Sequence, residues 1–394
     1  MNKNNRLKVM ISTEGTYPFH HGGVSTWCDV LVKELSEIDY VIYSVMMNPY
    51  LTQKYVLPKN ASLIKVPLWG TEDASEHLET PFSHVYMTKS ITNEAVVKNY
   101  FLPLFYTLLE EIMTVDKDPI RFGFTLHNLY SYFKEYDYTI SMKASITWET
   151  FKSYMHQNIL TLKSGEAIPS VFDLVQSLGW LYRFFTILNT PVPKVDVCHS
   201  AAAAFCGIPC VLAKYEYGTP YLLTEHGVYL REQYLSVNRS RLSSYQKIFL
   251  MKLIQSITSV NYYMADHISP VCNYNTRWEK EFGVHSSKIK VIYNGVDKNV
   301  FYPSIKPTLN SQQDHQLTVI TVARIDPVKD IESLLKAAEK VKKVIPNVRF
   351  IIYGIVMIQE YYEECLNLRN KLKLDNIVTF AGHTDDVPNV LRQA

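Results

Sequence analysis

Short apolar runs alternate with amphipathic segments over the first part of the chain. Residues 7–12, 40–46 and 62–68 are apolar over the length of a buried strand, whereas residues 23–35 repeat their apolar positions with helical spacing. Strands that alternate with helices in this way are typical of a parallel sheet covered on both faces. The pattern therefore predicts an α/β unit at the start of the chain.

The pattern changes between about residues 80 and 190, where long aromatic and helical segments replace the short strands. Helices are predicted at 94–111, 146–162 and 170–188, and strand-like runs return at 195–199 and 220–224. We therefore expect a helical insertion that interrupts a sheet, which resumes after it.

A second alternating series follows. It predicts strands at 289–293, 317–323, 349–353 and 377–380, and helices at 331–344 and 361–372. Residues 299–316 are polar and lack periodicity, which predicts a linker between two domains, 1–298 and 317–394. The second domain has only three clear strands, fewer than a doubly wound sheet normally has. We therefore expect this domain to be incomplete and the chain to be a truncated portion of a longer protein.

Length, charge and cysteines narrow the class of protein. The chain has 394 residues, 47% of them hydrophobic, which is enough for two cores of ~100–200 residues each. Its net charge of only +2, without a long basic run, makes nucleic acid an unexpected partner. The six cysteines form no CxxC pair, so they indicate buried thiols of a reducing compartment rather than a zinc ribbon or a disulfide framework.

Neither a secretory signal nor a transmembrane segment is predicted. The opening MNKNNRLKVMIS passes from polar residues directly into a short apolar strand. No apolar run approaches the ~18–20 residues that a membrane helix needs. These features predict a cytoplasmic location.

Arg324 and Lys329 are the candidate residues with the clearest chemistry. They follow an apolar strand in the stretch VARIDPVKD. A guanidinium binds two phosphate oxygens at once, and an ammonium beside it adds a point charge, so the pair suits a diphosphate. Two solvated surface cations are the alternative interpretation.

Other candidates lie where further strands end, the edge at which open α/β sheets bind ligands. Gly22 and Gly23 precede a helix, where a phosphate cradle and a plain turn are both possible. His226 follows the strand at 220–224 and either donates to a ligand or satisfies local backbone groups. No histidine and carboxylate pair has the spacing of a metal site.

Several stretches in a fixed order resemble the retaining glycosyltransferases of family 4, and most closely their PelF branch of Pel exopolysaccharide biosynthesis. They are EGTYPFHHGGVSTW, DVCHSAAAAFCGIPCVLAKYEYGTPYLLTEHGVYLRE, VIYNGVD, VARIDPVKDI and VTFAGHTDDV. The resemblance spans nearly the whole chain. It implies the GT-B fold, two Rossmann-like domains facing a cleft, with no metal and no cofactor beyond the nucleotide-sugar donor.

The resemblance also implies roles for particular residues. Arg324 and Lys329 would hold the donor diphosphate, Gly22 and Gly23 would lie under the distal phosphate and the transferred sugar, and His226 would contact that sugar. Gly382 and His383 would lie near the nucleobase. The catalytic residues would thus be His226, Arg324 and Lys329.

The implied reaction moves a sugar, most simply from UDP-glucose, onto a growing polysaccharide with retention of the anomeric configuration. The insertion at 80–190 would lie on the acceptor side, and inner-membrane polysaccharide synthase components are possible partners. The family's Glu-x7-Glu segment would fall beyond Ala394, so we expect this chain alone to bind donor weakly and turn over little. The alternatives are a non-catalytic nucleotide-sugar or polysaccharide-binding module of the same fold, and a phosphorylase-like enzyme whose pyridoxal-phosphate lysine the sequence does not place.

Overall fold

The computed structural model describes residues 6–70, 80–161, 168–302 and 317–392. The chain divides into two compact units, Met1–Asn294 and Gly295–Ala394. The sequence placed the end of the first domain at residue 298, and most of the predicted linker, residues 303–316, lies outside the described residues.

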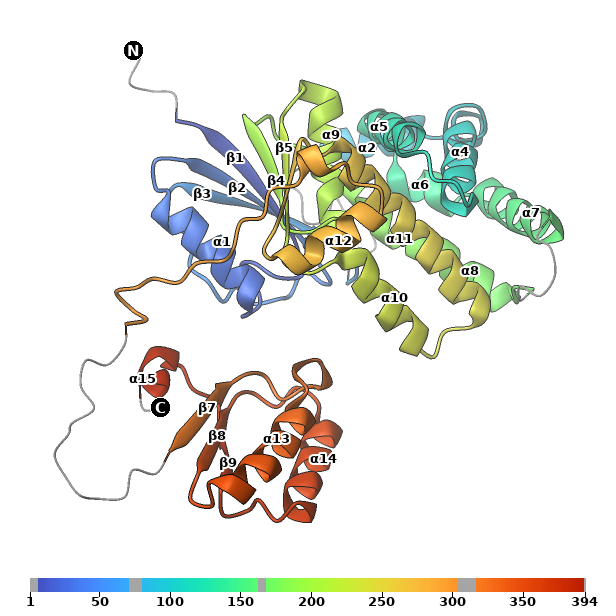
Figure 1. Cartoon of the computed structure of the whole chain (residues 1–394). Coiled ribbons are helices and arrows are strands. Elements are labelled where there is room, and N and C mark those ends of the chain that lie inside the picture. Colours follow the sequence, from blue (N-terminus) through green and yellow to red (C-terminus); the bar gives the residue numbers. More distant parts are fainter. Residues whose placement is uncertain (1–5, 71–79, 162–167, 303–316, 393–394) are drawn as a thin grey trace. The chain divides into compact units, whose positions relative to one another are not determined.

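The first unit is built on a six-stranded parallel sheet (Figure 1). Its strands are β1 (Lys8–Glu14), β2 (Asp39–Met46), β3 (Ala61–Pro67), β4 (Val197–Ser200), β5 (Tyr221–Glu225) and β6 (His267–Pro270). Their order is β3-β2-β1-β4-β5-β6, which is the order of the Rossmann fold. The direction of winding reverses between β1 and β4, and folds of this type bind ligands at the carboxyl ends of those strands.

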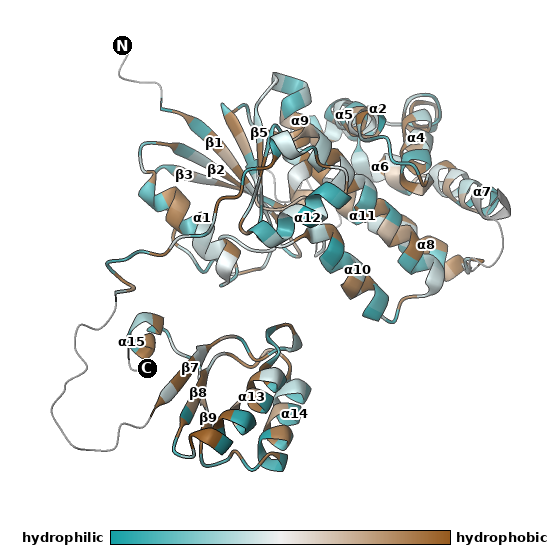
Figure 2. Ribbon diagram, in the orientation of Figure 1, coloured by the Kyte–Doolittle hydropathy of each residue, from teal (hydrophilic) through white to brown (hydrophobic). Residues whose placement is uncertain are grey.

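The side chains of the strands point alternately into two apolar layers, one on each face of the sheet. Val9 and Ile11 of β1 pack with Cys28 and Val32 of helix α1 (Gly23–Glu34), whereas Met10 faces the opposite layer. Successive side chains of a strand point to opposite faces, so a sheet buried on both sides needs continuous apolar runs. The strands therefore have the unbroken hydrophobic pattern seen in the sequence, and they are mostly white and brown in Figure 2.

The predicted helical insertion is confirmed. It contains α2 (Phe82–Ile91), α3 (Glu94–Val96), the π-helical turn η2 (Val97–Phe101), α4 (Leu102–Met113), α5 (Pro119–Glu135), α6 (Tyr138–Lys143), α7 (Ser145–Thr161), α8 (Val171–Phe184) and the 3-10 turn η3 (Phe185–Asn189). Much of α4, α5 and α8 is buried in the same large cluster as one face of the sheet. The insertion thus extends the core of the first unit.

The rest of the first unit covers and borders the sheet. It comprises the 3-10 turn η4 (Phe205–Gly207), α9 (Ile208–Tyr217), α10 (Tyr229–Arg239), α11 (Ser244–Met264) and α12 (Asn273–Glu281). The strand predicted at 289–293 does not form as a regular strand. Ile289 bridges Ile268, and the backbone N–H groups of Lys290 and Ile292 donate to carbonyls of β6, but Ile292 and Tyr293 are exposed. The segment follows the edge of the sheet, where apolar residues meet solvent, so its apolar pattern did not reflect a buried strand.

The second unit has a smaller parallel sheet, β7-β8-β9, with its own core. The strands are β7 (Thr318–Val322), β8 (Arg349–Tyr353) and β9 (Val378–Gly382), and the helices are α13 (Ile331–Val344), α14 (Gln359–Lys371) and α15 (Val387–Leu391). A Cβ atom built on Gly354 would lie 1.8 Å from the carbonyl oxygen of Ala323, so only glycine permits the close approach of the loops after β7 and β8.

These observations confirm the predicted α/β class, with parallel sheets, a helical insertion in the first unit and three strands in the second. All six cysteines are free, and all except Cys272 are buried, as the sequence indicated. Among the described residues, no helix is long and apolar enough to cross a membrane.

Candidate functional site

In the first unit, the candidate residues gather at the switch point between β1 and β4. Glu14 ends β1, His199 lies in β4, and His226 directly follows β5. Parallel strands bring their carboxyl ends to one edge of the sheet, so residues far apart in the sequence meet there.

Trp27 links the start of α1, which follows Gly22 and Gly23, to the loop after β5. The Trp27 ring meets the ring of His226 edge-on at 4.8 Å between centroids, and that of His199 at 5.2 Å. Edge-to-face contacts of this kind hold aromatic rings in fixed orientations. The structure therefore brings His226 and the first turns of the helix after Gly22 and Gly23 into one site.

The two glycines leave open space at the start of α1. Gly22 is the N-cap residue and Gly23 the first helical residue, and a Cβ atom built on either meets nothing within 4 Å. The φ of Gly22 is 165°, an extended conformation that any residue adopts. The fold itself does not require glycine here, so the missing side chains widen the approach to the helix N-terminus.

The histidines of the site are held neutral. Burial lowers the pKa of His226 to about 4. Burial, and then the nearby His226, lower the pKa of His199 to about 4. His199 Nε2 lies 2.8 Å from Thr224 Oγ1, which fixes its ring. A neutral imidazole both donates and accepts hydrogen bonds, as a sugar hydroxyl does.

Several buried polar atoms around the switch point have no hydrogen-bond partner among the described residues. They include Thr16 Oγ1 in the loop after β1, Ser25 Oγ in the first turn of α1, and His226 Nε2. A buried polar atom without a partner costs about 1–3 kcal/mol, and proteins retain few of them. Unpartnered polar atoms at the carboxyl end of the sheet are available to the polar groups of a ligand.

Glu14 is a functional candidate that sequence reasoning missed. Its carboxylate accepts hydrogen bonds from the Cys206 backbone N–H at 3.2 Å and the Tyr229 hydroxyl at 3.5 Å. Burial raises the pKa of Glu14 to about 7, against the lowering effect of the Cys206 N–H. Such a carboxyl group exchanges a proton near neutral pH. The available signal was a charged residue at the end of a buried strand.

A pair of carboxyl groups is also buried in the first unit. Glu225 and Glu279 are both fully buried, and the Tyr262 hydroxyl donates to Glu225 Oε2 at 2.9 Å. Burial, and then the charge of Glu279, raise the pKa of Glu225 well above its usual range. Two adjacent buried carboxyl groups do not both ionise, so this pair carries a proton at neutral pH.

In the second unit, both predicted cations lie in the loop after β7. Arg324 is two residues past the strand, and its guanidinium lies 3.5 Å from the Asp326 carboxylate. Lys329 ends a 3-10 turn, Pro327–Lys329, before α13, and the part of the chain that the structure describes offers it no ion-pair partner. The Arg324 side chain is 52% exposed, and Lys329 is exposed as well, so solvent or a ligand reaches both charges.

Gly382 ends β9 in the same unit, and His383 directly follows it. Gly382 has a φ of +79°, which favours glycine, and its carbonyl accepts from the Gly354 backbone N–H at 2.8 Å. His383 Nε2 lies 2.9 Å from Asp385 Oδ1. The backbone N–H of Ile325 in turn donates to Ile355, so hydrogen bonds join the loops after β7, β8 and β9 in sequence. The four predicted residues of this unit therefore share the carboxyl edge of its sheet.

Two family models match the chain. The model described as Domain of unknown function (DUF3492) matches residues 7–287, and the model described as Glycosyl transferases group 1 matches residues 306–394. The first match contains the switch point of the six-stranded sheet, and the second contains Arg324 and Lys329.

Individual proteins are similar over different shares of their length. The UDP-Gal:alpha-D-GlcNAc-diphosphoundecaprenol alpha-1,3-galactosyltransferase of Escherichia coli is 24% identical over 250 residues, which are 60% of this chain and 56% of that protein. The chain thus spans little more than half of this curated relative. HepE of Anabaena, solved with UDP and glucose, matches with a TM-score of 0.48 and 11% identity, over 98% of this chain and 72% of HepE. Sucrose-phosphate synthase from Thermosynechococcus elongatus matches with a TM-score of 0.47 and 14% identity, over 97% and 71% of the two chains.

Proposed function

We propose that this chain, which belongs to the family of the Domain of unknown function (DUF3492), is a retaining glycosyltransferase that uses a nucleotide-sugar donor. The main support is the loop that holds Arg324 and Lys329, because it lies within the segment that matches the group 1 glycosyl transferases. The similarity to a galactosyltransferase whose name gives a UDP-sugar donor agrees with this proposal.

In the proposed reaction, Arg324 and Lys329 bind the diphosphate of the donor. Negative charge grows on the leaving diphosphate as the bond to the sugar breaks, and two fixed cations stabilise that charge. Both side chains are exposed and follow one strand, so neither has to break a buried contact to bind phosphate.

The donor sugar is proposed to meet the switch point of the first unit. His226 is neutral, and its Nε2 atom has no hydrogen-bond partner among the residues that the structure describes, which suits a hydrogen bond to a sugar hydroxyl. The open N-terminus of α1 at Gly22 and Gly23 suits the distal phosphate, since helix N-termini favour anions. Gly382 and His383 are assigned to the nucleobase.

The finer assignment rests on the sequence resemblance alone. We propose UDP-glucose as the donor, a growing polysaccharide as the acceptor, and a role like that of the PelF branch of family 4 in exopolysaccharide synthesis in the cytoplasm. Attack from the same face that the diphosphate leaves would retain the anomeric configuration, and the departing diphosphate would take the acceptor proton.

The test is release of free UDP or GDP from a panel of UDP- and GDP-sugars by the full-length protein. Alanine at Arg324 or Lys329 is expected to lower the rate at least about 100-fold, the usual cost of removing one fixed charge from a leaving group. The matched controls are Arg349→Ala, at the amino end of β8, and Lys340→Ala, on the exposed side of α13.

Equal rates in the Arg324 and Lys329 variants and in the wild type would refute the role of these cations. Tight UDP binding that depends on both residues, without any sugar transfer by the full-length protein, would instead favour a non-catalytic nucleotide-sugar-binding module.

A further inference from the structure

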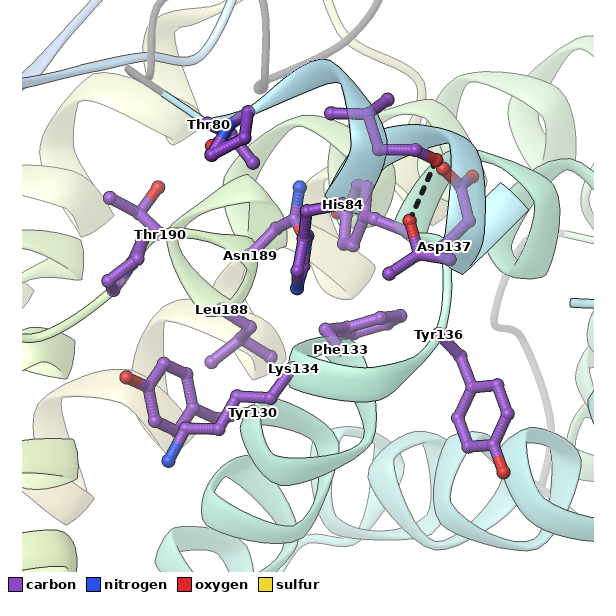
Figure 3. Close-up of a pocket in the computed structure, with 15 residues that line it drawn as sticks. Thr80, His84, Tyr130, Phe133, Lys134, Tyr136, Asp137, Leu188, Asn189 and Thr190 are labelled. Carbon is purple, nitrogen blue, oxygen red and sulfur yellow. Dashed lines mark hydrogen bonds between the residues drawn. The ribbon is translucent and has the colours of Figure 1, made fainter. Parts of the chain in front are cut away.

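The helical insertion contains a cavity of about 360 Å³ (Figure 3). Its walls come from α2, from the second half of α5 and from the residues around the end of η3. Its lining includes His84, Val85, Phe133, Lys134 and Asn189. A cavity of this size lies within the range of small-molecule sites.

The cavity is separate from the switch point. Asn189 and Pro191 lead into the start of β4, and Lys134 pairs with Glu216 shortly before β5 begins. These contacts place the cavity toward the amino ends of the strands. The candidate site of this unit lies at their carboxyl ends.

Two polar side chains are directed into the cavity. Figure 3 shows His84 and Asn189 pointing into it, with the ring of Phe133 below them in this view. Neither side chain has a hydrogen-bond partner within the described ranges of the chain. An amide and an imidazole each offer a donor and an acceptor, which match the paired hydroxyls of a carbohydrate.

The charged groups of the lining are already engaged. The Lys134 ammonium pairs with Glu216 and lies 4.4 Å from the centre of the Tyr130 ring. The Asp137 carboxylate caps α6 by accepting from the Ile140 backbone N–H at 2.7 Å. The cavity therefore offers little to a phosphate or a carboxylate, and its apolar residues, Phe133 and Val85 among them, favour an uncharged ligand with an apolar face.

Helix α2 lines the cavity with His84 and Val85 and, one turn further on, with Thr88. This face points inward, yet none of the residues of α2 is buried. In most globular proteins the inward face of a helix is covered, and that packing supplies much of its stability. A ligand in the cavity would cover this face.

We propose that the cavity binds one sugar residue of a neutral carbohydrate, with its apolar face on Phe133 and its hydroxyls on His84 and Asn189. The binding itself depends only on the side chains that line the cavity. Its biological use, holding part of the growing polysaccharide away from the reacting end, rests on the proposed function.

The experiment measures binding to the whole chain without any nucleotide sugar. The probes are methyl α-D-glucopyranoside, N-acetylglucosamine, maltotriose and cellotriose, followed by ligand-observed NMR and by hydrogen exchange of the α2 amides. We expect at least one probe to bind and to slow exchange in α2. Asn189→Ala and His84→Ala are each expected to weaken binding about three- to tenfold, the effect of one neutral hydrogen bond.

His156→Ala is the matched control, because His156 is exposed on α7 outside the cavity lining. Tighter binding of a trisaccharide than of a monosaccharide supports a polymer as the source, and equal binding supports a free sugar. The proposal is overturned if no probe binds, if the Asn189 and His84 variants bind like the wild type, or if inorganic phosphate displaces the sugar. A full-length protein that binds sugar here but releases no UDP or GDP would support the cavity and contradict the proposed function.

Discussion

Glu14 keeps a carboxyl group in surroundings that favour its uncharged form. Burial raises its pKa to about 7, so the folded chain holds a proton that the unfolded chain releases above about pH 4.5. The stabilising contribution is complete below the unfolded pKa, and it is lost as the pH rises through about 7. The neighbouring histidines act in the opposite direction. The pKa values of His199 and His226 are lowered to about 4, so their stabilising contribution is lost as the pH falls from about 6.5 to below about 4.

Replacing Glu14 with Gln should isolate the carboxyl contribution. Glutamine cannot ionise, so the stability of the variant relative to the wild type should rise by on the order of 2 kcal/mol between about pH 5 and about pH 8. Urea unfolding of the first unit at both pH values measures this difference. At each pH the variant is compared with the wild type, so the contributions of His199 and His226 cancel.

The matched control for Glu14 is Glu34→Gln, which changes an exposed carboxyl group on α1 of the same unit. Its difference from the wild type should be the same at both pH values. A Glu14→Gln difference that is equally flat would show that the buried carboxyl group does not take up a proton on folding.

At the residue scale, the sequence revealed the candidates that follow their own strand and missed those defined by distant partners. Arg324 and Lys329 stand out because strand and charge are adjacent in the sequence. Glu14 becomes notable only through Cys206 and Tyr229, which lie 192 and 215 residues away. Trp27 becomes notable only through rings at the ends of two other strands. Such long-range contacts have no local pattern to read.

At the scale of elements, the start of α1 separates the requirements of folding from those of binding. A methyl group at Gly23 meets nothing within 4 Å, so Gly23→Ala should leave the free energy of unfolding unchanged or slightly higher. It would nevertheless narrow the approach to the helix N-terminus, where the donor phosphate is proposed. We expect weaker binding of UDP-sugars, measured by calorimetry, together with an unchanged melting temperature.

Gly179→Ala is the control for this change. Gly179 lies inside α8, and a Cβ atom there also meets nothing within 4 Å, so alanine should stabilise the helix by about 0.5–1 kcal/mol. It should not alter donor binding. If both variants bind UDP-sugars like the wild type, the open space at α1 has no part in holding the phosphate.

Elements were predictable where an apolar run or a helical spacing of apolar residues marks them in the sequence. The segments β8 and α13 were predicted with the bounds that the structure has, because apolar runs and helical spacing mark them clearly. The short strand β6 was missed because His267–Pro270 includes two polar residues and a proline at the sheet edge. The helix predicted at 94–111 is divided into α3, η2 and α4, and Pro103 in the first turn of α4 gives the physical reason.

At the scale of the whole molecule, each unit has a core of its own. The buried cluster of the second unit centres on residues such as Leu335 and Phe350, and it shares none of its members with the clusters of the first unit. Separate cores are expected to unfold in separate transitions.

Leu335→Ala and Leu253→Ala test this independence. Both side chains are fully buried, one in each unit, and truncating a buried leucine costs about 2–5 kcal/mol. In calorimetry of the whole chain, Leu335→Ala should lower only the transition of the second unit, and Leu253→Ala only that of the first. A single transition that moves with either variant would show that the units unfold together.

The insertion also determines when the central sheet can form during synthesis. Lys8 and Asp196, which join the starts of β1 and β4, are 188 residues apart. At ~5–20 residues per second, the ribosome delivers β4 roughly 10–40 s after β1. Throughout that time β1 has one bare hydrogen-bonding edge beside apolar side chains, the condition under which nascent chains aggregate and chaperones bind.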